Sequence, residues 1–202
     1  MKKALVSIFL FFILTAPSAY AKVKFSSGVE WGYKACTYHK YHYNYLSEEG
    51  VRINDKGTDN ELFSNGEIYG FAGAYVSDYL NLSLYAGFSG IYSDRRVYPV
   101  SARASWYFKG RSSDGLKAFV DLGSAFTDTF NRQKLLLGKA AVGYRFALDK
   151  DWGMDLNLCV QYVSDHPDKV IDKYAGTVVT ESSLRRCDTT NILFGASVSI
   201  SF

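Results

Sequence analysis

The last twelve residues of the chain alternate between two kinds of side chain. Every even position from Ile192 to Phe202 is apolar, and every odd position from Asn191 to Ser201, apart from Leu193, is Asn, Gly or Ser. Successive side chains of a β-strand point to opposite faces, so this pattern predicts a strand with one apolar and one small, polar face. Any fold for this chain must therefore give the two faces of a sheet different environments.

Seven further segments show the same period of two. They span about residues 23–35, 67–76, 80–89, 98–108, 118–126, 136–146 and 154–162. The first segment continues into a tyrosine-rich stretch over residues 38–45. Each strand is long enough to cross a bilayer at a tilt of ~45°. We therefore predict an all-β fold, an eight-stranded antiparallel up-and-down transmembrane β-barrel.

The connections between the expected strands are of unequal length. Short turns follow the second, fourth and sixth strands, whereas long polar loops over residues 44–66 and 164–186 follow the first and the seventh. With both termini on one side, all the longer loops fall on the other side. Short turns on one side and longer loops on the other are typical of transmembrane barrels.

The alternative is a soluble barrel that buries its apolar face. Two features favour the membrane version: the less hydrophobic face is rich in Gly, Ser and Asn, and aromatic residues gather toward both ends of the apolar face. At the turn side we expect Phe25, Tyr75, Trp106, Phe108, Tyr144, Phe146 and Phe202. At the loop side we expect Tyr69, Tyr92, Tyr98, Phe126 and Tyr162.

The beginning of the chain carries the features of a secretory signal peptide. Two lysines, an apolar run and a small-x-small cleavage site that ends at Ala21 predict a signal peptide over residues 1–21. Residues 22–202 would then form one outer-membrane β-barrel domain. The chain has 23 basic and 20 acidic side chains without a basic block, so nucleic acid is not an expected partner.

The alternation that ends on the aromatic Phe202 resembles the final strand of bacterial outer-membrane β-barrels. Over its whole length the pattern resembles small eight-stranded barrels such as the OmpA transmembrane domain and OmpX. The resemblance implies the outer membrane of a Gram-negative bacterium, contact with its lipid and lipopolysaccharide, and recognition of Phe202 by the barrel-assembly machinery. It also implies a structural or surface-interaction role without a cofactor or a catalytic residue.

Eight charged side chains fall on the face expected to line the lumen. They are Lys24, Glu30, Lys34, Arg103, Asp121, Lys139, Arg145 and Asp155. The interior of an eight-stranded barrel is just wide enough for side chains to fill, and buried charges there must be paired. We therefore predict a salt-bridged plug that closes the lumen. A narrow, porin-like polar path is the alternative.

The three cysteines also fall on the lumen face. Cys36 and Cys187 lie at similar distances from the two ends of the barrel sequence, on strands that adjoin in a closed barrel. Because the compartment is oxidising, we predict a Cys36–Cys187 disulfide, with Cys159–Cys187 as the competing pair. Neither His nor a paired Cys stands at ligand spacing, so no metal site is expected.

Two functional hypotheses concern the loop side. The long loops 44–66 and 164–186 flank the same seam and would form one polar surface for a host, phage or polysaccharide ligand, or simply two solvated loops. A lipid A-modifying enzyme would need a His with a Ser or carboxylate at this rim. His39 and His42 lie there, followed by Ser47-Glu48, although a place in the aromatic girdle explains both histidines as well.

Overall fold

The computed structural model describes residues 24–60, 62–91, 96–126, 135–149, 151–167, 169–172 and 175–202. The signal peptide predicted over residues 1–21 and the girdle residue Tyr92 lie outside these ranges. Among the described residues, no helix is long and apolar enough to cross a membrane.

The described residues are mostly β-strand. The strands are β1 (Lys24–Leu46), β2 (Arg52–Asp59), β3 (Phe63–Tyr75), β4 (Leu80–Gly90), β5 (Arg96–Tyr107), β6 (Gly115–Phe126), β7 (Leu136–Ala147), β8 (Gly153–Asp165), β9 (Lys169–Ile171), β10 (Val178–Thr180) and β11 (Leu184–Ser201). One turn of 3-10 helix, η1 (Glu181–Ser183), leads from β10 into β11.

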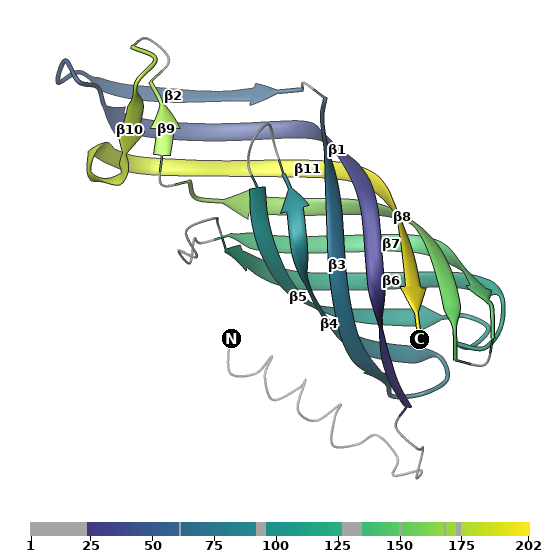
Figure 1. Ribbon diagram of the computed structural model, residues 1–202. Helices are drawn as coiled ribbons and strands as arrows, with labels where there is room; N and C mark the ends of the chain where they lie inside the picture. The colour runs from purple at the N-terminus through teal and green to yellow at the C-terminus, as the bar shows by residue number, and fades with distance from the viewer. Residues whose placement is uncertain are drawn as a thin grey trace, which may run out of the picture.

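Eight of these strands form a closed antiparallel barrel (Figure 1). Their order is β11-β8-β7-β6-β5-β4-β3-β1, and β1 pairs with β11 to close the ring. Ser27 and Phe202 meet at this seam, where each backbone N–H donates to the carbonyl oxygen of the other at 2.9 Å. Closure pairs the backbone groups that an open sheet leaves free at its edges. The predicted eight-stranded up-and-down fold is confirmed.

The closing strands β1 and β11 continue beyond the barrel as a three-stranded extension with β2 (Figure 1). Past a bulge after Cys36, β1 leaves β3 and pairs with β2, from His39 opposite Asp59 to Leu46 opposite Arg52. Gly50 turns the β1–β2 hairpin with a φ of 78°, in the left-handed region that favours glycine. The short β9–β10 hairpin lies beside this extension.

The extension corrects the prediction of two irregular polar loops. Residues 44–66 contain the end of β1, all of β2 and the start of β3, and residues 164–186 contain β9, β10 and the start of β11. β2 shows no apolar alternation because Ile53 is its single apolar side chain, which packs against the buried cluster of Tyr45, Val170, Val179 and Cys187. It forms a strand because its backbone pairs with the tyrosine-rich half of β1.

The outer surface of the barrel is apolar. Large side chains such as Leu84, Leu122, Val142, Leu158 and Phe194 are more than half exposed at the outward positions. Exposed aromatic residues stand among them, including Phe25, Tyr98, Trp106, Phe108, Tyr144, Tyr162 and Phe202. A hydrocarbon environment suits this surface, because its apolar atoms are not covered by protein.

Strand β3 corrects the expected aromatic girdle. Tyr69 and Tyr75 are buried in the lumen, with Phe71 on the same face, whereas Ile68, Gly70 and Ala72 point outward. Phe71 stacks on Tyr85 with ring centroids 4.7 Å apart, and Tyr69 meets the edge of the same ring. The rings face inward because the lumen next to β3 holds aromatic and cationic partners for them.

Candidate functional site

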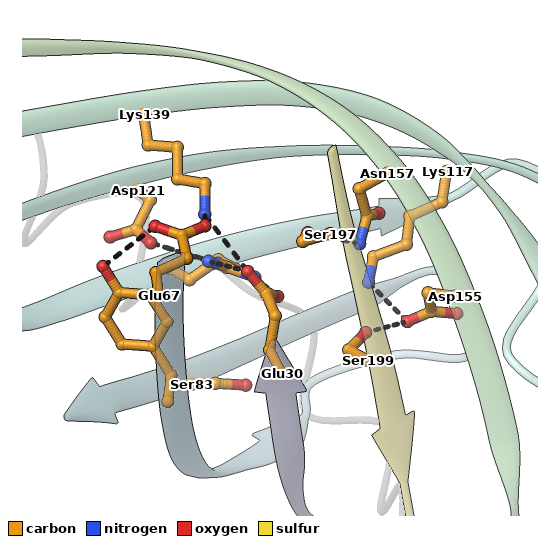
Figure 2. Close-up of polar contacts among 12 residues, drawn as sticks. Glu30, Glu67, Ser83, Lys117, Asp121, Lys139, Asp155, Asn157, Ser197 and Ser199 are labelled. Atoms are coloured by element: carbon orange, nitrogen blue, oxygen red, sulfur yellow. Dashed lines mark hydrogen bonds and ion pairs between the residues drawn. The ribbon is translucent and has the colours of Figure 1, made fainter. Parts of the chain in front are cut away.

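A compact ion-pair layer crosses the middle of the lumen (Figure 2). Lys139 Nζ lies 2.6 Å from Glu67 Oε1 and 3.1 Å from Glu30 Oε1. Arg103 pairs with the same Glu30 and, at 2.9 Å, with Asp121 Oδ2. Lys34 Nζ lies 2.8 Å from Glu67 Oε2 and also donates to Gln161 and Ser89, each at 2.7 Å. Three carboxylates thus neutralise three cations.

Arg103 is held between two aromatic rings as well as by its carboxylates. Its guanidinium carbon lies 3.7 Å from the centre of the Tyr85 ring and 3.8 Å from that of Phe119. A planar guanidinium can stack on rings and form several hydrogen bonds at once, which a lysine ammonium cannot. The packing therefore fixes the position of this cation across the lumen.

A second cluster lies nearer the turn side, around Asp155. Lys117 Nζ lies 2.5 Å from Asp155 Oδ2, and the Ser199 hydroxyl donates to the same oxygen at 3.3 Å (Figure 2). Arg145 Nη1 lies 3.1 Å from Asp155 Oδ1. Arg145 also donates to the carbonyl oxygen of Arg111 at 2.7 Å, which ties the β5–β6 turn to the lumen.

On the loop side of the ion pairs, the lumen is filled by an apolar layer. Its buried members are Cys36, Ile91, Val97, Ala125, Leu135, Leu137, Val163 and Leu193. An ion that crossed the barrel would have to leave water, pass this layer and then separate paired charges. Both steps are costly in a low-dielectric interior.

The structure brings seven of the eight predicted lumen charges into these two clusters. Lys24 is the correction: as the first residue of β1 it lies exposed at the turn-side rim. Sequence reasoning missed Glu67 and Lys117, which are both buried in the clusters. Glu67 was missed because it lies on the same face of β3 as Tyr69 and Tyr75, which the sequence analysis placed on the lipid side. Lys117 could have been found, since it precedes Phe119 and Asp121 on the same face.

The predicted Cys36–Cys187 disulfide is wrong: none of the three described cysteines is in a disulfide, and all three are buried. Cys36 lies opposite Leu193, six residues or ~20 Å of strand away from Cys187, far beyond the reach of a disulfide. The alternative pair fails too, because Cys159 lies opposite Gly195, eight residues from Cys187. The closing strands are staggered, so counting from the chain ends misplaces their partners.

The two rim histidines occupy different faces of the extension. His39 is buried, and its Nδ1 donates to Asn191 Oδ1 at 2.5 Å. His42 contacts Asn54 Oδ1 through Nε2 at 2.9 Å on the other face. Ser47 stands at the hairpin tip, where its hydroxyl accepts from the backbone of Val51. The His and Ser residues considered for an enzyme are therefore not brought to one point.

The inner face of the extension carries a cavity of about 390 Å³. It is lined by His39, Tyr41, Tyr43, Tyr45, Asp55, Asp59, Val170 and Ile171. The rings of Tyr41 and Tyr43 stack with centroids 5.0 Å apart, and His39 stacks on Tyr41 at 5.8 Å. We call this cavity the tyrosine groove. It was not expected, because its β2 wall had been taken for a loop.

No protein-family model matches the chain, and no curated protein is similar to it. The chain is similar in fold to several solved structures. Neisserial surface protein A gives a TM-score of 0.47 at 14% identity, over 88% of this chain and 99% of that one. OprG, an outer membrane protein from Pseudomonas aeruginosa, gives 0.45 at 11% identity, over 88% and 95%. The outer membrane protease OmpT from Escherichia coli gives 0.37 at 9% identity, over 88% and 96%.

Proposed function

We propose that this chain is an outer-membrane barrel that acts through its outward extension, as a surface-interaction protein with a closed lumen. The apolar exterior agrees with the outer-membrane location that the sequence predicts. The extension then projects on the side away from the start of β1 and the end of β11, which in this orientation is the outside of the cell.

The observation that carries this proposal is the contrast between the filled interior of the barrel and the hollow in the extension. The middle of the barrel is filled by paired charges and an apolar layer, so the interior serves stability rather than transport. The extension is an ordered sheet that holds a hollow with polar and aromatic walls. Binding sites are commonly concave and of this mixed character, on parts that a rigid scaffold positions.

Conductance measurements test the closed lumen. The purified barrel in planar lipid bilayers should give no unitary current steps, because each charge of the middle layer is paired. Regular steps in the wild type that change in Lys139→Ala would contradict the proposal and support a narrow channel.

Chemical labelling of intact cells tests the orientation of the extension. Thr58 is exposed on β2, and Ser112 is exposed in the β5–β6 turn. With a membrane-impermeant maleimide, T58C should react on intact cells and S112C only after the outer membrane is opened. The three native cysteines are buried and make a low background. The reverse labelling pattern would overturn the proposed outward position of the extension.

A further inference from the structure

The tyrosine groove has one wall made by β2 and a floor made by β1. Cross-strand pairing places Asp59 opposite His39, Gly57 opposite Tyr41 and Asp55 opposite Tyr43. Residues that face each other in an antiparallel pair project to the same side. The two carboxylates therefore lie along the edge of the ring stack, four residues apart on β2, which corresponds to ~13 Å.

Gly57 makes room for the central ring of the stack. A Cβ atom at this position would lie 2.5 Å from the Tyr41 hydroxyl oxygen and 2.7 Å from Cζ. The Tyr41 side chain therefore reaches across β2 at the glycine, between the two carboxylates. As a result, aromatic surface and negative charge alternate along the groove from Asp55 to Asp59.

The charge of the lining is one-sided. Asp55 and Asp59 are half-buried, and among the described residues neither takes part in an ion pair. In the β1–β2 pair Lys40 lies opposite Thr58, and Lys56 lies opposite His42. Both lysines therefore project to the other face of the sheet. The part of its lining that the structure describes contains no lysine or arginine, so the groove is unsuited to phosphate or acidic sugars and suited to a cation.

The far wall of the groove belongs to β9, which is fastened to the extension. Val170 and Val179 pack with Tyr45 and Cys187 in a buried cluster, and the Tyr45 hydroxyl donates to Asp172 at 3.5 Å. This contact holds Val170 and Ile171 over the end of the ring stack. The open groove has a volume of about 390 Å³, which is in the range of small-molecule sites.

We infer that the tyrosine groove binds a small linear polyamine, whose ammonium groups lie against Asp55 and Asp59 and whose methylene chain crosses the Tyr41 ring. The inference rests on the proposed function, in which the extension faces the outside. Ammonium groups combine charge-assisted hydrogen bonds to carboxylates with cation–π contacts to tyrosine. The ~13 Å between the carboxylates is a span that a linear polyamine can bridge.

Calorimetric titration of spermine into the complete folded barrel, in zwitterionic detergent at constant ionic strength, tests the inference. Wild-type protein should bind spermine at one site. D55N and D59N should each weaken the affinity about tenfold, because each replaces a charged hydrogen-bond acceptor by a neutral amide of similar shape. E49Q is the matched control: it makes the same change of charge at the exposed hairpin tip, outside the groove, and should bind as the wild type does.

The aromatic contribution needs its own pair of variants. Y41L removes the ring and should weaken spermine binding severalfold, whereas Y41F keeps the ring and should leave it within about twofold. Circular dichroism of each variant shows whether the barrel is folded. Equal weakening by E49Q and D55N would mean that spermine responds to net charge alone and would overturn the inference. Absence of binding to the wild type, or binding of maltose in place of spermine, would overturn it too.

The outcomes separate this inference from the proposed function. If T58C is labelled on intact cells and the lumen does not conduct, but spermine fails to bind, the polyamine site is wrong and the surface role stands. If T58C is not labelled, the outward orientation is wrong, whatever the purified protein binds.

Discussion

At the scale of single residues, the lumen depends on Arg103 more than on any of its lysines. This guanidinium joins Glu30 on β1 to Asp121 on β6 and packs between the rings of Tyr85 and Phe119. A buried ion pair adds little net stability compared with apolar residues of the same volume, but a lone buried charge costs much more. Loss of the arginine would leave Asp121 without its cation, while Glu30 would keep Lys139.

Replacement of Arg103 should therefore be strongly destabilising. R103A should lower the free energy of unfolding by about 3–5 kcal/mol, measured by urea titration of the barrel in lipid vesicles. R186A removes an arginine from an exposed ion pair with Asp188 and should change stability by no more than ~1 kcal/mol. R103A should recover part of its lost stability when D121N removes the charge that has lost its partner. Equal stability of R103A and R186A would show that the lumen charges are hydrated.

The rim histidines lead to a second prediction at this scale. His39 is held by Asn191, and Ser47 lies at the tip of the hairpin, so the structure does not bring this histidine and this serine together. We expect the same lipid A mass spectrum from cells that express the wild type, H39A or no copy of the gene. Gain or loss of one acyl chain with the wild type, but not with H39A, would instead identify a lipid A-modifying enzyme.

At the scale of elements, local pattern predicted the barrel strands well and the extension poorly. The face of β3 was misassigned because aromatic residues suit a lipid-facing girdle as well as a lumen lined by Arg103, and period two cannot distinguish them. β2 carries no apolar alternation and owes its strand to pairing with β1. Such pairing is tertiary information, which a single segment does not contain.

The attachment of the β9–β10 hairpin can be tested through Tyr45. This side chain is almost fully buried against Val170 and Val179. Y45A should release the hairpin, because it removes the contacts that hold it on the sheet. Hydrogen exchange at the amides of residues 169–171 and 178–180 should then become at least tenfold faster, while exchange in the barrel strands stays the same. L46A, the exposed neighbour, is the control and should leave both regions unchanged.

At the scale of the whole molecule, the sequence did not reveal how β1 and β11 are offset. Their register places Gly28 opposite Ser201, so the first residues of β1 extend past the end of the chain. This offset is a global property of a closed barrel, set by strand number and shear rather than by any segment. Inward positions follow from the alternation within each strand, so most of the lumen charges could be predicted as a set. Partners across the seam depend on the offset, so the cysteine pairing could not be predicted.

Closure of the seam by Phe202 gives the last prediction. The Phe202 backbone pairs with Ser27, and its exposed ring lies 5.3 Å from that of Trp152. A serine at this position keeps the backbone pairing, so F202S should refold into lipid vesicles with nearly wild-type yield. If the terminal aromatic ring is read by the assembly machinery, F202S should accumulate at less than half the wild-type level in the outer membrane of living cells. W152S removes the packing partner and should lower neither quantity to this extent. A low yield of F202S in vesicles as well as a low level in cells would mean that the ring stabilises the barrel itself.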